Sequence, residues 1–93
     1  MPKECVQCCR ALEELVQEIR KLAAKDPLVS RVAAKMEVKL QAAIVEAKKD
    51  TQDLKLILSK LNEARTYLAR VASASGLQNN FAETITLVRS HLP

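Results

Sequence analysis

The chain has 93 residues, the length of one domain, of which 48% are hydrophobic and 28% charged, with a mild formal net charge of +4. A chain of this size buries roughly two-thirds of the surface that its unfolded form exposes, which suffices for a single core. One Gly and three Pro are too few for the many turns of an all-β fold, and the abundant Ala and Leu favour helices. Because Phe81 and Tyr67 are the only aromatic residues, the core must be aliphatic.

The first predicted helix runs from about Pro2 to Lys25. Pro suits a first helical position, and apolar residues then recur at helical spacing on one broad face. That face is formed by Cys5, Cys8, Cys9, Leu12, Leu15, Val16, Ile19 and Ala23. Asp26 followed by Pro27 predicts the start of a second helix, because Asp is a good N-cap and Pro is favoured directly after it.

The second predicted helix has apolar residues on two sides. Its main stripe consists of Val29, Val32, Met36, Leu40, Ala43 and Ala47. The other stripe recurs at i, i+4, i+7 and i+11 on the opposite face, and consists of Ala34, Val38, Gln41 and Val45. A one-sided surface helix carries charged residues there, so this helix is predicted to make contacts on two sides.

A third helix is predicted from the spacing of Leu54, Ile57, Leu58, Leu61, Ala64, Leu68, Val71 and Ala72. Asp50 and Asp53 resemble a capping box, Thr51 is an alternative cap, and Gly76 occupies the position at which helices often end with a left-handed residue. No Gly or Pro separates the second and third helices. The alternative is therefore one continuous helix over about residues 27 to 75, whose core would be completed by a second copy in an intertwined dimer.

A fourth helix of about three turns is predicted from Phe81, Ile85, Val88 and Leu92, with Asn80 as N-cap and Glu83 completing a capping box. Neither an internal repeat nor a low-complexity linker divides the sequence. We therefore predict a single domain over residues 1–93. Its expected fold is an all-α, antiparallel helical bundle of three long helices and a short C-terminal fourth.

Cys5, Cys8 and Cys9 are the candidates for modification or redox chemistry. A C-x-x-C pair can supply two zinc ligands, but structural zinc takes four, and the other soft candidate is His91 at the far end of the sequence. The alternatives are packing of all three cysteines as small apolar residues, reversible acylation or redox pairing, and a metal shared between subunits. We predict no metal ligand and no cofactor within one chain.

No catalytic site is predicted either. His91 is the sole histidine and lies two residues from the end of the sequence, and neither a phosphate-binding Gly-rich motif nor an H-E-x-x-H motif occurs. No small-molecule substrate is evident. The absence of a long apolar run predicts no membrane span, and the sequence lacks a secretory signal, so a cytoplasmic location is expected.

Arg65 falls within the apolar stripe of the third predicted helix, about 40° from Leu61. A charge there is costly unless the side chain reaches solvent, pairs with a carboxylate such as Glu13 or Glu83, or contacts a partner. Arg65 is therefore a candidate for a buried ion pair or a partner contact.

These observations predict a non-catalytic protein interaction or adaptor module that acts through an aliphatic helix face and associates with itself. The predicted interaction surface is Ala34, Val38, Gln41, Val45, Leu56 and Tyr67. The alternative is a small basic nucleic-acid-binding protein, since the excess of Lys and Arg lies on the second and third helices. The lack of aromatic residues for base stacking makes that alternative the weaker one.

Overall fold

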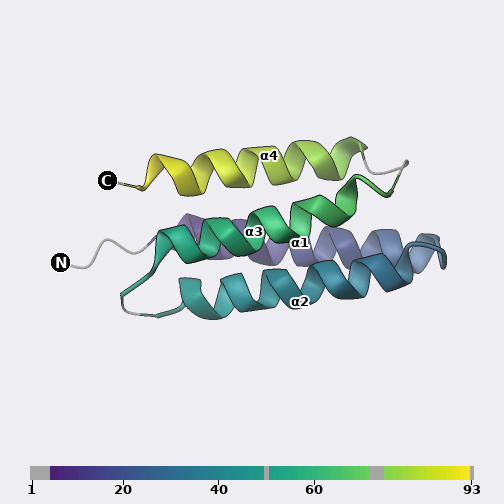
Figure 1. Ribbon diagram of the computed structural model, residues 1–93, viewed down its shortest axis with the longest axis horizontal. Coiled ribbons are helices and arrows are strands. Elements are labelled where there is room, and N and C mark those ends of the chain that lie inside the picture. The colour runs from purple at the N-terminus through teal and green to yellow at the C-terminus, as the bar shows by residue number, and fades with distance from the viewer. Residues whose placement is uncertain (1–4, 50, 72–74, 93) are drawn as a thin grey trace.

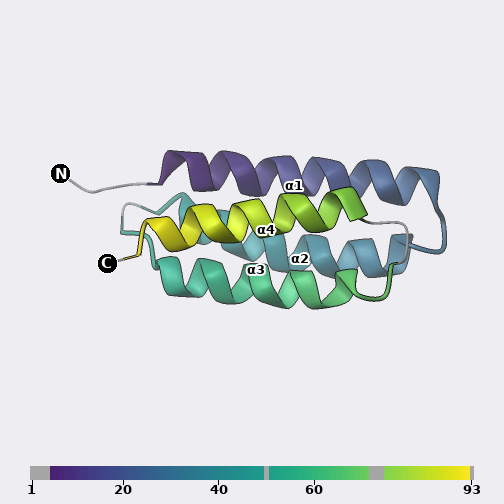
Figure 2. The ribbon, with the colours of Figure 1, turned by 90° about the horizontal axis from the view of Figure 1, so that it is seen from above.

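The structure is a computed structural model that describes residues 5–49, 51–71 and 75–92, and these parts of the chain contain four helices and no strand. Helix α1 spans Val6–Lys25, α2 spans Ser30–Ala47, α3 spans Leu54–Leu68 and α4 spans Ser75–Ser90. Successive helices run in opposite directions and lie side by side (Figures 1 and 2). The predicted all-α antiparallel bundle is confirmed.

The bundle is closed, because α1 and α3 each pack against both α2 and α4. It measures 44 × 19 × 17 Å. With an even number of alternating helices, the beginning of α1 and the end of α4 lie at the same end of the bundle, at the left of Figure 1. The α2–α3 connection lies at that end too, while the α1–α2 and α3–α4 connections lie at the other.

The core follows the long axis of the bundle and receives one apolar stripe from each helix. Its largest fully buried side chains are Leu12, Leu15, Ile19, Met36, Leu40, Ile57, Leu61, Leu68, Phe81 and Val88. Phe81 on α4 places its aromatic ring in an interior of otherwise non-aromatic side chains. Tyr67 is only half-buried and packs against the edge of this core. The core is thus completed within one chain.

The boundaries of α1 and α2 depart from the prediction at their N-terminal ends. The described part of α1 begins at Val6 with Cys5 as its N-cap, and the predicted start near Pro2 lies outside the described residues. Asp26 accepts a hydrogen bond from the Leu28 amide at 3.0 Å, so it caps a turn, and α2 itself begins only at Ser30. The predicted end of α1 at Lys25 agrees with the structure.

The alternative of one fused helix over residues 27 to 75 is wrong. Residues 48–49 and 51–53 are not helical, and α3 runs back antiparallel along α2. The buried carboxylate of Glu46 accepts hydrogen bonds from the Asp53 amide and from Lys49 Nζ, both at 3.0 Å. Asp53 then caps α3 by accepting from the Leu56 amide at 3.1 Å, while the predicted contribution of Asp50 lies outside the described residues.

The prediction of a short fourth helix was also wrong. Helix α4 has 16 residues and α3 has 15, because α3 ends at Leu68 and α4 already begins at Ser75. Gly76 lies inside α4 without a positive φ, so it is not a left-handed cap. Asn80 also lies inside α4, where its carbonyl accepts a hydrogen bond from the Thr84 hydroxyl. The physical reason is burial: Leu77 extends the apolar stripe of Phe81 by one turn and is itself buried.

Candidate functional site

The outer face of α2 exposes apolar side chains to solvent. Val38 is 67% exposed and Val45 is 62% exposed, and Ala34 and Gln41 are exposed beside them. Ala42, which the sequence analysis did not include, is exposed on the same face. We call this surface the α2 seam, formed by Ala34, Val38, Gln41, Ala42 and Val45. The stripe predicted on the back of the second helix therefore faces solvent in the single chain.

The two residues of α3 predicted to extend this surface differ in exposure. Leu56 is 39% exposed near the beginning of α3. Tyr67 near its end is half-buried and packs against the core, so much of its ring already has partners within the chain. Among the residues that the structure describes, the most exposed large apolar side chain was not predicted: Leu28, in the α1–α2 turn, is 90% exposed.

The α2 seam has a basic rim. Arg31, Lys35 and Lys48 are exposed residues at its edges. Helix α2 carries only two acidic residues, and both are engaged: Glu37 accepts a bidentate pair of hydrogen bonds from Arg20 of α1, and Glu46 is buried beneath the α2–α3 connection. The exposed charges that α2 itself contributes beside the seam are therefore positive.

Cys5 and Cys8 form a disulfide at the beginning of α1. Their side chains are 1% and 0% exposed, and Cys5 Sγ also accepts a hydrogen bond from the Cys8 amide at 3.1 Å. The amide of Cys5 donates to Gln52 Oε1 at 2.8 Å, and Gln52 in turn donates to the carbonyl of Ala47. The cysteine pair is thus held against the α2–α3 connection, which lies at the same end of the bundle.

His91 completes this end of the bundle. Its Nδ1 lies 3.6 Å from Cys5 Sγ and 2.9 Å from the carbonyl oxygen of Leu87. Ligand atoms of Cys5, Cys8 and His91 all lie within 4.8 Å of one another. His91 is far from the cysteines along the sequence but lies beside Cys5 in space, because the beginning of the first helix and the end of the last helix lie at the same end of a four-helix bundle.

Cys9 is a separate, free thiol of intermediate burial. Its Sγ lies 3.8 Å from Glu13 Oε1. Burial, followed by the charge of Glu13, raises the pKa of the Cys9 thiol, although Lys48 opposes that change. Since the thiolate is the reactive form, these surroundings make Cys9 a poor nucleophile.

Arg65 is exposed and, among the residues that the structure describes, takes part in no ion pair. The predicted buried ion pair with a carboxylate is therefore wrong for the single chain, because the side chain reaches solvent at the edge of the stripe. Contact of Arg65 with a partner stays a prediction. Other basic residues of α2 and α3 are partly neutralised: Lys39 and Lys60 both pair with Glu63.

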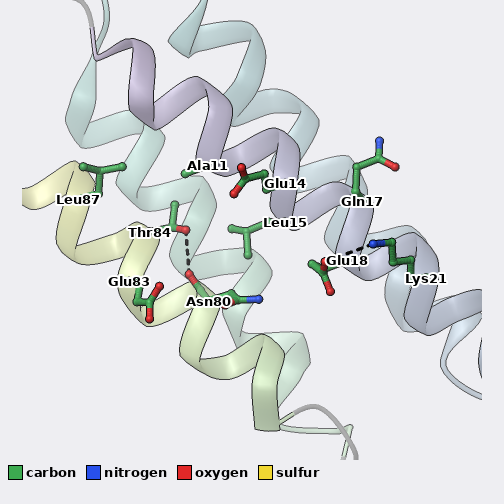
Figure 3. Close-up of a pocket in the computed structure, with 10 residues that line it drawn as sticks. All are labelled: Ala11, Glu14, Leu15, Gln17, Glu18, Lys21, Asn80, Glu83, Thr84 and Leu87. Carbon is green, nitrogen blue, oxygen red and sulfur yellow. Dashed lines mark hydrogen bonds and ion pairs between the residues drawn. The ribbon is translucent and has the colours of Figure 1, made fainter.

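An open groove of about 410 Å³ separates α1 from α4 (Figure 3). Its lining residues are Ala11, Glu14, Leu15, Gln17, Glu18, Lys21, Asn80, Glu83, Thr84 and Leu87. Lys21 pairs with Glu18 at 3.7 Å, and the buried Thr84 hydroxyl donates to Asn80 as the dashed line shows. Lys21, Glu18 and Thr84 therefore have partners in the protein, and the carboxylate residues Glu14, Glu18 and Glu83 are exposed.

Comparisons of the chain with protein-family models, with curated proteins and with solved structures found no match. Within the described parts of the chain, no helix is both long enough and apolar enough to cross a membrane.

Proposed function

We propose that this protein is a non-catalytic interaction module whose α2 seam binds an amphipathic helix with acidic flanks from a partner protein. The observation that carries the proposal is the exposure of Val38 and Val45, at 67% and 62%, on a helix whose opposite side already fills the core. Because these two side chains lie outside the core, folding of the single chain does not require them to be apolar. Their apolar character is instead suited to contact with a partner.

The spacing of the α2 seam suits a helix better than an extended peptide. Ala34, Val38, Gln41 and Val45 follow the alternating four- and three-residue steps of a heptad repeat. The small side chains of Ala34 and Ala42 allow a second backbone to approach closely. The seam spans 11 residue steps, about 16 Å or three helical turns, which is the length of a short amphipathic helix in a groove.

The charge of the rim identifies the kind of partner. In an antiparallel pair of seams centred near Val38 and Gln41, Arg31 of one copy would approach Lys48 of the other. In a parallel pair, each of these cations would lie opposite the same residue of the other copy. Like charges in these positions weaken association, whereas Glu or Asp flanks on a different helix would pair with them. The self-association expected from the sequence is thus the less favourable use of the seam.

The test uses two synthetic amphipathic helical peptides with the same Leu seam, one flanked by Glu and the other by Lys, with binding followed by fluorescence anisotropy. We expect the Glu-flanked peptide to bind and the Lys-flanked peptide to bind at least tenfold more weakly. The double variant Val38→Glu with Val45→Glu should lose roughly 30-fold in affinity, because the exposed parts of two Val side chains contribute about 2 kcal/mol when buried.

The matched control adds the same two charges elsewhere, as Ala82→Glu with Thr86→Glu on the exposed side of α4. It should leave binding unchanged. Equal binding of both peptides, or equal effects of the two double variants, would overturn the proposal. A dimer in light scattering that is lost on Val38→Glu with Val45→Glu would assign the seam to a second copy. Salt-sensitive binding to unrelated DNA that survives this double variant would favour the nucleic-acid alternative.

A further inference from the structure

The cluster of Cys5, Cys8 and His91 joins the two ends of the chain and has no part in the proposed interaction surface. Two sulfur atoms from the beginning of α1 and an imidazole that follows α4 come together there, across 86 positions of sequence. As a cross-link the disulfide does little, since a bond between residues three positions apart closes a very short loop. A bond from the same sulfurs to His91 would instead tie the first helix to the last.

The distance between the Cys5 sulfur and the His91 nitrogen fits a tetrahedral transition-metal ion. Bonds of about 2.3 Å to sulfur and about 2.0 Å to nitrogen place these two ligand atoms about 3.5 Å apart in a zinc site. The distance between Cys5 Sγ and His91 Nδ1 is 3.6 Å. Two sulfur ligands of one zinc ion are about 3.8 Å apart. The Cα atoms of Cys5 and Cys8, at 5.1 Å, allow this once the bond between the sulfurs is opened.

The donor set and its surroundings also fit. Thiolate and imidazole are the protein ligands that Zn²⁺ prefers, and two thiolates neutralise its charge. Cys5 and Cys8 lie at the positive end of the α1 dipole, which stabilises thiolates, and the Cys8 amide already donates to Cys5 Sγ. Both cysteines are at least 99% buried, so a bound ion would be shielded from water on the protein side.

His91 can serve as the third ligand without rearrangement of α4. Its Nδ1 lies within reach of the Leu87 carbonyl and of Cys5 Sγ, and the tautomer decides its role. The Leu87 carbonyl oxygen, 2.9 Å from Nδ1, can only accept, so in this arrangement Nδ1 carries the proton and donates it to that oxygen. Binding of a metal ion would move the proton to Nε2 and replace this hydrogen bond by a bond from the Nδ1 lone pair to the ion. His91 is exposed to solvent, so a water molecule can supply the fourth ligand.

The geometry points to a zinc site that forms when the Cys5–Cys8 disulfide is reduced, with Cys5, Cys8 and His91 as ligands and water in the fourth position. Reduction by a dithiol transfers two electrons and two protons to the two sulfurs, and the reductant leaves as its own disulfide. Each thiol then releases its proton as it binds Zn²⁺. The disulfide and the zinc site exclude each other, because both use the same two sulfur atoms, so the site is occupied only under reducing conditions.

The test titrates the intact protein with Co²⁺ and then Zn²⁺, after reduction with a phosphine in oxygen-free buffer. We expect one Co²⁺ per chain, with the visible spectrum of a tetrahedral ion, a thiolate-to-metal charge-transfer band and displacement by Zn²⁺. His91→Ala should weaken Co²⁺ binding by at least tenfold, since even the loss of an outer-shell partner costs about that much. At Zn²⁺ concentrations 100-fold above the dissociation constant, the Tm of the reduced protein should rise by about 10 °C.

Two controls keep the test decisive. Cys9→Ser should bind as the parent does, because Cys9 faces Glu13. Cys5→Ser retains an N-cap oxygen for α1 and so should fold, yet it should lose the metal. The inference is overturned if the reduced parent binds no Co²⁺, if His91→Ala binds as tightly as the parent, or if the oxidised protein binds equally well. One ion per two chains would also overturn it, because the site would then be shared between subunits.

Discussion

Whether α4 begins at Ser75 or at Asn80 can be decided by two substitutions whose effects have opposite signs under the two alternatives. The sequence favours Asn80 as an N-cap and Gly76 as a left-handed C-cap of the third helix. The structure places both residues inside α4, with Asn80 exposed and Gly76 without a positive φ. We therefore expect that Asn80→Ala and Gly76→Ala each raise the free energy of unfolding.

The magnitudes follow from helix propensity, because neither change disturbs packing. Asn is about 0.5 kcal/mol less favourable than Ala within a helix, and its side chain is exposed here. A Cβ added to Gly76 meets no atom within 4 Å. Replacing Gly by Ala should stabilise the helix by about 0.5 kcal/mol, the lower end of the usual range, because Gly76 lies in the first turn.

The assay is urea unfolding followed by far-ultraviolet circular dichroism. With a slope of about 1 kcal/mol per molar urea for a domain of this size, each variant should shift the midpoint upward by about 0.5 M. If Asn80 were an N-cap, its replacement by Ala would instead lower the stability by about 1 kcal/mol. If Gly76 were left-handed, Ala would be strained there and destabilising. A downward shift in either variant would refute the assignment of α4.

Two further predictions concern the core and the pairing of α1 with α2. Phe81→Ala should lower the free energy of unfolding by about 3 to 5 kcal/mol, because it removes the one aromatic ring from the described core. Phe81→Leu should retain most of the stability. If urea unfolding of Phe81→Ala showed a loss below about 1 kcal/mol, Phe81 would not be buried. Hydrogen bonds from Arg20 are the largest cause that lowers the pKa of Glu37 below its ordinary value of 4.5. The ionised pair therefore stabilises the folded protein above pH 4.5, and this stabilisation is lost as the pH falls through the lower pKa that Glu37 has in the folded state. Glu37→Gln and Arg20→Gln should therefore flatten the fall in stability between about pH 6 and pH 3 to the same extent, and a parent and variants with parallel pH profiles would contradict this.

The sequence predicted the class of fold because each helix carries its own apolar stripe. The stripe containing Leu54, Leu61 and Leu68 is visible without knowledge of its partners, and so is the exposed seam of α2. The ends of the helices were less predictable, because local capping motifs compete with burial. At α4 the motif around Asn80 was outweighed by the burial of Leu77, which lies four residues before Phe81 and so continues the same stripe.

The cluster at the chain ends was missed because sequence separation was taken as spatial distance. Counting the predicted helices would have corrected this: four alternating helices return the chain to the end at which it began, and His91 then lies beside Cys5. The anchoring of the same end by Glu46 and Gln52 had no comparable signal. Their partners, the amides of Asp53 and Cys5, are set by how the α2–α3 connection turns.

The meeting of both chain ends at one end of the bundle also determines how the molecule would respond to a pulling force. A force that pulls Cys5 and Leu92 apart would act perpendicular to the bundle axis. It would separate α1 from α4 one helical turn at a time, starting from that end. Helices pulled from opposite ends of the bundle would instead have to slide past each other along their whole length, about 30 Å for the 20 residues of α1. The first contact to carry the load would be that between Cys5 and His91. The mechanical strength of the whole bundle would then depend on whether a metal ion joins these two residues.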